Sequence, residues 1–285
     1  MSEIERAITN WFALNARDLP WRNSNPWGVL VSEFMLQQTP VVRVTPKWHE
    51  WMERWPTPDA LAAASPADVI TAWGRLGYPR RALRLRDCAT LIAKEHNNEV
   101  PSDVATLLTL PGVGSYTAAA IASFAYEKEA LVLDVNIRRL FARLYDGTDL
   151  LTSAPSKKEI AERTELLPDK DAHTWAAATM ELGALICTAR SPQCEKCPVV
   201  SSCKWRAAGY PAAATKKRVQ KWHGTDRQCR GTIIEALRNA PSLGAHEIDQ
   251  LWSEKEQLQR ALESLIKDQL ITIWQERYRL PQKIN

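Results

Sequence analysis

The chain contains no apolar run that approaches the roughly 18 residues that a membrane-spanning helix needs. Its first residues, MSEIERAITNWF, include acidic side chains and lack the apolar stretch of a secretory signal peptide. Cysteine is scarce as well, with six among 285 residues. We therefore expect a cytoplasmic protein without a membrane partner, in a compartment where structural disulfides are rare.

The remaining composition is that of an ordinary globular protein. Hydrophobic residues make up 45% of the chain and charged residues 25%, and the length allows one large domain or two. The net charge of +4 is mildly basic. Such a charge permits nucleic acid as a partner but does not establish it.

Four of the six cysteines lie in one short segment, CTARSPQCEKCPVVSSC. In a reducing compartment, clustered cysteines favour a metal site over disulfides. Structural zinc is usually held by two separated pairs of close ligands, whereas this segment has a single C-x-x-C with one cysteine on either side. Four cysteines are also the number that holds a [4Fe–4S] cluster, so the segment favours a cluster and leaves zinc and unligated buried thiols open. The four residues are Cys187, Cys194, Cys197 and Cys203.

Residues 1–205 read as short amphipathic helices punctuated by Pro, Gly, Asp or Ser. Among them, LLTLPGVGSYTAAAIASFA (107–125) predicts a helix, a tight turn over Pro111–Gly114 and a second helix that opens at Ser115. Two glycines permit backbone conformations closed to other residues and would let a phosphate approach the N–H groups of the second helix. An ordinary helical hairpin that ends on glycine is the alternative.

Two carboxylates have notable surroundings. In ALVLDVNIRRLFARL (130–144), Asp134 ends an apolar run and precedes a helix, which predicts an N-cap and leaves a catalytic role possible. Arg138 and Arg139 nearby add phosphate-binding capacity. In WGVLVSEFMLQQTPV (27–41), the helical neighbours of Glu33 are mostly apolar, so we expect it to be buried with a raised pKa. A raised Glu33 and a lower, capped Asp134 would suit acid and stabiliser roles.

Six motifs, taken together and in order, resemble the helix-hairpin-helix DNA glycosylase superfamily and, within it, the adenine DNA glycosylases of the MutY type. Each motif is weak by itself, and the resemblance extends from residue 1 to about residue 212. The motifs are LPWR (19–22), SEFMLQQT (32–39), GRLGY (74–78), LPGVGSYTA (110–118), LDVNIRRL (133–140) and the C-x6-C-x2-C-x5-C segment.

This resemblance implies a mainly α, endonuclease III-like fold of two domains with a DNA cleft between them. A six-helix barrel domain over 26–131 would carry the hairpin, and residues 1–25 with 132–212 would form an iron–sulfur cluster domain. The four cysteines would ligate a [4Fe–4S] cluster that shapes a DNA-binding loop and takes no part in the chemistry.

The implied activity is base excision repair: hydrolysis of the N-glycosidic bond of adenine mispaired with 8-oxoguanine or guanine in double-stranded DNA. A base inside a duplex must first be flipped into a pocket. Glu33 would then protonate the adenine as general acid, and Asp134 would stabilise the cationic sugar. Tyr116 and Asn136 match positions that assist these two carboxyl groups.

The resemblance also implies a set of DNA contacts. Trp21 and Arg22 would line the adenine pocket. In the Gln37–Gln38 pair, Gln38 would fill the gap left in the base stack, and Tyr78 would insert near the opposite base. The hairpin would grip the backbone beside the lesion through Pro111, Gly112, Val113, Gly114 and Ser115.

Two departures qualify this resemblance. Relatives similar to endonuclease III carry a lysine nucleophile where this chain has Tyr116, so we expect a monofunctional enzyme. Some adenine glycosylases carry Glu or Gln four residues before the ELGA motif, where this chain has Ala177, so base reading rests on other groups. Thymine-mismatch glycosylases are the nearest alternative, and the paired glutamines favour adenine. A non-catalytic iron–sulfur DNA-binding protein is the alternative of another class, which the presence of both Glu33 and Asp134 disfavours.

The C-terminal part resembles the family less. Residues 213–225 read as a basic linker, and residues 226–285 read as three short helices followed by the strand–turn–strand LITIWQERYRLP, a winged-helix-like α+β module. Well-known adenine glycosylases instead carry a longer, Nudix-like domain that recognises 8-oxoguanine. The module is therefore expected to contact DNA or a protein partner, or to cap the catalytic body, in a chain that we expect to be a monomer.

Overall fold

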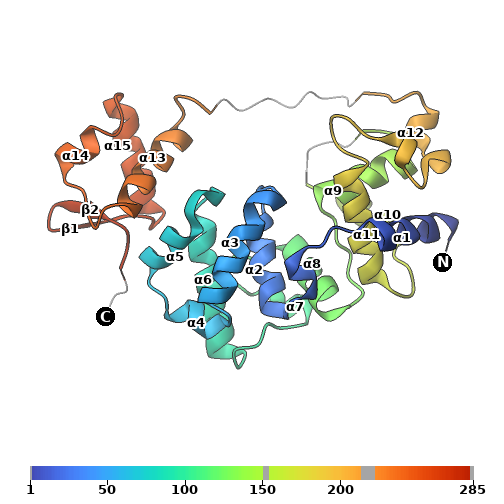
Figure 1. Cartoon of the computed structure of the whole chain (residues 1–285), viewed down its shortest axis with the longest axis horizontal. Coiled ribbons are helices and arrows are strands. Elements are labelled where there is room, and N and C mark those ends of the chain that lie inside the picture. Colours follow the sequence, from blue (N-terminus) through green and yellow to red (C-terminus); the bar gives the residue numbers. More distant parts are fainter. Residues whose placement is uncertain (1, 150–153, 213–221, 283–285) are drawn as a thin grey trace. The chain divides into compact units, whose positions relative to one another are not determined.

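The computed structural model (Figure 1) describes residues 2–149, 154–212 and 222–282. These residues form two compact units. Unit 1 contains the residues up to 29, 102–108 and the described residues from 113 to 212. Unit 2 contains residues 30–101, 109–112 and the described residues from 222 onward. The predicted domain boundaries stay a prediction, and residues 213–221 of the predicted linker lie outside the described residues.

Several helices begin at capping side chains that the sequence supplies. The hydroxyl of Ser65 accepts the N–H of Asp68 at 3.0 Å, and that of Ser156 accepts the N–H of Glu159 at 3.1 Å. Each such cap stabilises its helix by about 1 kcal/mol, because it satisfies an N–H that has no partner within the helix. The prediction of short amphipathic helices over residues 1–205 is confirmed in the described part of that range.

The longer elements in the described part of unit 1 are α-helices. The helix α11 (Ala172–Leu185) packs against α1 (Glu3–Asn15), α8 (Ser115–Tyr126) and α9 (Val135–Phe141). Trp175 of α11 stacks on Phe141 of α9 with ring centroids 6.1 Å apart. The other α-helices of this unit are α7 (Val104–Leu107), α10 (Lys157–Thr164) and α12 (Lys204–Ala207).

The first part of unit 2 contains α-helices that wrap a tryptophan-rich core. Trp51 is buried between Trp55 and Trp73, with ring centroids 4.7 and 5.4 Å away. The helices are α2 (Pro26–Leu36), whose first residues belong to unit 1, α3 (Val41–Arg54), α4 (Pro58–Ala63), α5 (Pro66–Trp73) and α6 (Arg80–Glu95). α4 and α5 both pack on α6.

The C-terminal part of unit 2 is a winged helix. Helices α13 (Asp226–Arg238), α14 (Ala245–Asp249) and α15 (Lys255–Lys267) precede an antiparallel pair of strands, β1 (Thr272–Trp274) and β2 (Arg277–Arg279). Leu243, between α13 and α14, pairs with Tyr278 through two backbone hydrogen bonds of 2.8 Å and adds a third strand position. The predicted winged-helix-like module is confirmed. Within the described ranges, no helix is both long and apolar enough to cross a membrane.

Candidate active site and cluster loop

Asp134 caps α9 and is held by its own helix. One carboxylate oxygen accepts the N–H of Ile137 at 2.6 Å, and the other accepts the side-chain amide of Asn136 at 2.6 Å. Arg139 in turn donates to the Asn136 amide oxygen at 2.8 Å. The amide is thereby oriented with its N–H toward Asp134, so the carboxylate, the amide and the guanidinium form one fixed chain.

Burial decides the pKa of Asp134. Desolvation raises it above its usual value, and the hydrogen bonds from Ile137 and Asn136 and the charge of Arg139 lower it by less than burial raises it. The predicted order, with the pKa of Asp134 below that of Glu33, stays a prediction. The cap is present as predicted, but the side chain lies too deep for it to dominate.

Arg139 also reaches the cysteine segment. Its Nε donates to the carbonyl oxygen of Cys187 at 2.7 Å, and its Nη2 donates to the carbonyl of Gly183 at 2.6 Å. The side chain is buried, and Arg138 beside it pairs with Glu159 at 2.6 Å. The expectation that these two arginines bind phosphate is not supported, because both are occupied within the protein.

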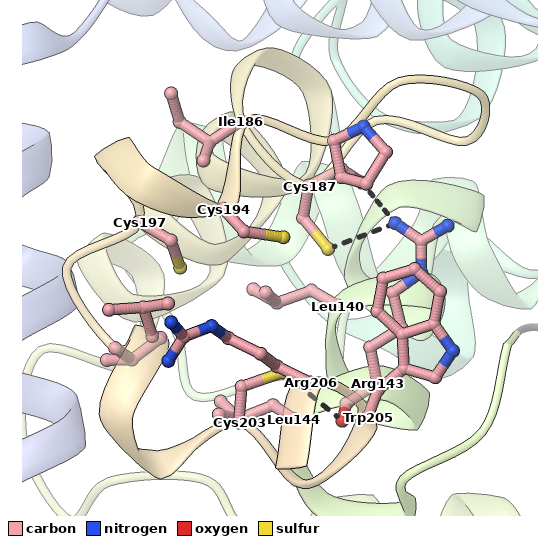
Figure 2. A pocket seen from close by; sticks show the side chains of 13 residues that line it. Leu140, Arg143, Leu144, Ile186, Cys187, Cys194, Cys197, Cys203, Trp205 and Arg206 are labelled. Atoms are coloured by element: carbon pink, nitrogen blue, oxygen red, sulfur yellow. Dashed lines mark hydrogen bonds between the residues drawn. The ribbon is translucent and has the colours of Figure 1, made fainter. Parts of the chain in front are cut away.

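The four clustered cysteines line one pocket (Figure 2). All are free thiols, and Figure 2 shows their sulfur atoms facing a common space between the loop after α11 and the end of α9. The described residues hold no set of three or more His, Cys, Asp or Glu arranged for a single metal ion. Four inward-facing thiols in an otherwise largely apolar pocket fit a [4Fe–4S] cluster, which takes four thiolates.

The surroundings of this pocket supply positive charge to the thiols. Arg143 is buried, donates to the Sγ of Cys187 at 3.4 Å and lies 4.3 Å from the ring centre of Trp205. Burial raises the pKa of Cys187, against the lowering effect of Arg143, and raises that of Cys197 to about 11. Because these thiols hold their protons at neutral pH, binding of the cluster must release them.

Glu33 lies near the C-terminal end of α2 in unit 2. It is buried, with 5% of its surface exposed, and its neighbours Leu30 and Phe34 are buried as well. The burial that the helical spacing predicts is therefore found. Burial shields the carboxyl group of Glu33 from bulk water. A shielded carboxyl group is suited to donate a proton as a general acid.

Two loops beside Glu33 are tied together by Arg81 of α6. Its guanidinium donates to carbonyl oxygens of Phe34, at 2.9 Å, Gln37 and Gly77, at 3.0 Å. Burial lowers the pKa of Arg81 to about 10, so it remains a cation at neutral pH. The exposed Gln38 and Tyr78 project from these loops, both with left-handed backbone (φ 57° and 47°), which non-glycine residues seldom adopt.

The hairpin before α8 uses its two glycines differently. Gly112 has φ 82°, and a Cβ there would lie 2.8 Å from the ring of Phe34, so close packing requires glycine. Gly114 has open space around the position of a Cβ, consistent with the approach of a ligand. Pro111 and Gly112 also line a polar pocket of about 590 Å³. Its other polar walls are Arg80, Arg84 and Asp87 of α6 and, at the C-terminal end of α15, Lys267, Asp268 and Gln269.

The remaining predicted site residues, Tyr116, Trp21 and Arg22, all lie in unit 1. Tyr116 is half-buried in the first turn of α8, between the exposed Ser115 and buried residues. Trp21 is buried in the short 3₁₀ turn Pro20–Asn23. Arg22 donates to the buried carboxylate of Glu181 at 3.1 Å, so its guanidinium is held inside unit 1.

Among the predicted site residues, Asp134 and Asn136 are therefore hydrogen-bonded to each other. The loops of Gln37 and Tyr78 are connected through Arg81. The structure also shows ionic groups whose burial the sequence analysis did not predict. Arg139 and Arg143 could have been recognised, because their spacing of four residues places both on one face of a helix. Arg81 and the pair of Glu181 with Arg17, joined at 2.7 Å, left no such signal.

Comparison with known proteins gives two family matches. Residues 31–169 match the family described as HhH-GPD superfamily base excision DNA repair protein. Residues 187–203, the cysteine segment itself, match the iron–sulfur binding domain of endonuclease III.

Similar sequences and structures agree with these matches. The chain is 50% identical over 270 residues to a Mycolicibacterium smegmatis protein named adenine DNA glycosylase, covering 93% of this chain and 91% of that protein. It is 37% identical over 211 residues to the Homo sapiens adenine DNA glycosylase, covering 70% of this chain and 39% of that protein. A thermostable thymine-DNA glycosylase is similar in structure, with a TM-score of 0.67 at 25% identity over 72% of this chain and 95% of that one. An endonuclease III in a non-covalent DNA complex has a TM-score of 0.62 at 22% identity, over 72% of this chain and 94% of that one.

Proposed function

Because the chain belongs to the adenine DNA glycosylases of the helix-hairpin-helix superfamily, we propose that its substrate is adenine mispaired with 8-oxoguanine or guanine in double-stranded DNA. The enzyme removes adenine from DNA and carries a [4Fe–4S] cluster. The opposite base is the proposed part. It is supported by the motif resemblance, and the assignment to adenine is carried by 50% identity that extends over 93% of the chain.

We further propose the roles of the site residues. Glu33 protonates the departing adenine, and its burial supports this role because a shielded carboxyl group can hold a proton near neutrality. Asp134 stabilises the positive charge that develops on the sugar. Asn136 orients that carboxylate, and Tyr116 occupies the position where lyases of this superfamily carry lysine, which supports a monofunctional reaction.

Gln38, Tyr78 and the hairpin are proposed to hold the duplex while the adenine is flipped. The left-handed backbone at Gln38 and Tyr78 supports this role, since strained, exposed loop residues gather at ligand-binding sites. In the hairpin, Gly112 packs against Phe34 while Gly114 leaves room for a phosphate. Because Arg22 is paired with the buried carboxylate of Glu181, it would shape the adenine pocket through its position more than through a free charge.

Replacement of Asn136 by alanine is expected to move the acid limb of the rate–pH profile to higher pH. The Asn136 amide favours the ionised form of Asp134, so its loss raises an already raised pKa further. Excision needs the ionised carboxylate, which is present above the pKa and lost as the pH falls through it. Single-turnover rates across the pH range measure the shift. Asn15→Ala, an exposed change in α1, is the control, and an unchanged limb in Asn136→Ala would remove the orienting role.

The proposed substrate is tested with four duplexes that differ in one central pair: A·8-oxoG, A·G, A·T or T·G. Single-turnover excision rates are measured on each. We expect removal of adenine from A·8-oxoG and A·G, and no reaction with A·T or T·G. Excision of thymine from T·G, or equal rates on A·8-oxoG and A·T, would contradict the proposal.

A cytoplasmic location and a monomeric state complete the proposal. Double-stranded DNA is the one partner that the family assignment requires. Sedimentation of the protein alone and with one duplex tests the stoichiometry, with one protein per duplex expected.

A further inference from the structure

The winged helix is not a tethered appendage but part of unit 2. Ile70 of α5 lies in one buried cluster with Ile233 and Leu237 of α13 and Leu262 of α15. Arg238 donates to the carbonyl of Ile70 at 3.2 Å. Side chains of the module therefore hold fixed positions relative to α5 and to the loop that follows it.

Two ion pairs extend this attachment on either side of the loop that carries Tyr78. Arg75 pairs with Glu235 at 3.1 Å, and Arg80 pairs with Asp268 at 3.0 Å. Each pair is partly exposed and contributes about 0–1 kcal/mol, so the two pairs matter more for the placement of the module than for stability. The loop of Tyr78 lies between two points at which the module is attached.

At this loop the module contributes Arg227, from the first turn of α13. Its guanidinium carbon lies 4.5 Å from the ring centre of Tyr78 and 5.3 Å from that of Trp222. Both rings are exposed, Tyr78 by 42% and Trp222 by 48%. In the part of the chain that the structure describes, no carboxylate pairs with Arg227. This cation on an exposed surface has aromatic rings as its partners.

The geometry leaves Arg227 suited to an anion. Its contacts are with ring faces, so they do not use its N–H groups, and a planar guanidinium can donate two parallel hydrogen bonds to a phosphate. Contact with an aromatic ring also restrains the ring, with a strength of about 0.5–1 kcal/mol at an exposed site. One side chain can therefore hold Tyr78 and bind an anion next to it.

We propose that Arg227 is a DNA-binding and positioning residue, which binds a backbone phosphate and holds the ring of Tyr78 for insertion into the duplex. The second part rests on the proposed function, since it takes Tyr78 to insert near the base opposite adenine. In this way the short winged helix takes part in substrate recognition through a fixed contact at the loop of Tyr78.

The phosphate contact is tested by salt dependence with Arg227→Ala in the full chain. Binding is measured to a duplex that carries an uncleavable tetrahydrofuran abasic-site analogue opposite 8-oxoguanine. We expect the Kd to rise about tenfold, as for loss of one charge-assisted contact, and the slope of log Kd against log salt to fall by about 0.9. Arg260→Ala, which removes another exposed arginine of the module near Asp226, is the matched control and should leave the slope unchanged.

The contact with Tyr78 is tested by Arg227→Lys and by a double-mutant cycle. Lysine keeps the positive charge but has no planar guanidinium to stack on the ring of Tyr78. In Arg227→Lys the salt slope should therefore equal that of the wild type, while the single-turnover rate on A·8-oxoG stays below it. In a Tyr78→Ala background, Arg227→Ala should lower that rate by less than it does in the wild type.

The proposal is overturned if Arg227→Ala changes Kd by less than about twofold and the slope by less than about 0.2, which is the resolution of such a titration. It is equally overturned if Arg260→Ala has the same effect. Thermal unfolding of each variant excludes loss of fold as the cause. If the wild type removes no adenine, the proposed function fails, while the salt slope still decides whether Arg227 contacts DNA.

Discussion

Glu33→Gln is expected to abolish excision of adenine while duplex binding stays nearly intact. Glutamine has the shape of the glutamate but no acidic proton, and loss of a general acid lowers a rate by about 10²- to 10⁴-fold. The fold should survive, because the replacement removes an ionisable group from a position that is 5% exposed and adds no volume. Single-turnover rates on A·8-oxoG and Kd on the uncleavable duplex are measured side by side.

Glu50→Gln provides the matched control for this change. Glu50 is an exposed residue of α3 that pairs with Lys47 at 2.5 Å, and its replacement should leave both rate and affinity unchanged. Full activity in Glu33→Gln would remove the general-acid assignment. Loss of binding together with activity would show that Glu33 acts in recognition of DNA.

Gly183→Ala is expected to lower both stability and excision rate. A Cβ at this position would lie 2.6 Å from the carbonyl oxygen of Asn136 and 2.8 Å from its carbonyl carbon. Both are backbone atoms that cannot rotate away, so α9 and α11 must separate. Overpacking of this kind costs about 1–3 kcal/mol. The carbonyl of Gly183 also accepts a hydrogen bond from Arg139. The separation therefore disturbs the series of hydrogen bonds from Arg139 through Asn136 that orients Asp134.

Gly231→Ala is the corresponding control, because it makes the same substitution inside a helix at a position where the added methyl group meets no other residue. Nothing lies within 4 Å of a Cβ at Gly231, and alanine should stabilise α13 by about 0.5–1 kcal/mol. Urea denaturation midpoints and single-turnover rates are compared for the two variants. A Gly183→Ala protein as stable and as active as the wild type would show that the two helices adjust freely.

Local features of this protein could be predicted from its sequence because neighbouring residues determine them. The N-caps at Ser65, Ser156 and Asp134 follow from side chains three residues from their partners. The burial of Glu33 follows from the spacing of apolar residues on a helix, and the winged helix follows from the order of its short elements. The cysteine segment could be recognised as a candidate metal site because its four cysteines lie close together in the chain, and the family resemblance then implied a [4Fe–4S] cluster.

Features that depend on distant parts of the chain could not be predicted. The cap at Asp134 is visible in the sequence, whereas the depth of burial that raises its pKa is not. Glu181 accepts a hydrogen bond from Arg17 across 164 positions, and the contact of Arg227 with Tyr78 depends on how the winged helix packs on α5. Such pairings follow from the tertiary fold, which no local pattern encodes.

We propose that this chain removes adenine without cutting the DNA strand, and one divided reaction distinguishes the two activities. An end-labelled A·8-oxoG duplex is incubated with the enzyme, half is treated with hot alkali, and both halves are separated on a denaturing gel. We expect strand breaks at the adenine in the alkali-treated half alone, because Tyr116 offers no amine to form a Schiff base. Breaks of equal intensity without alkali would contradict it and would require a lyase nucleophile elsewhere in the protein.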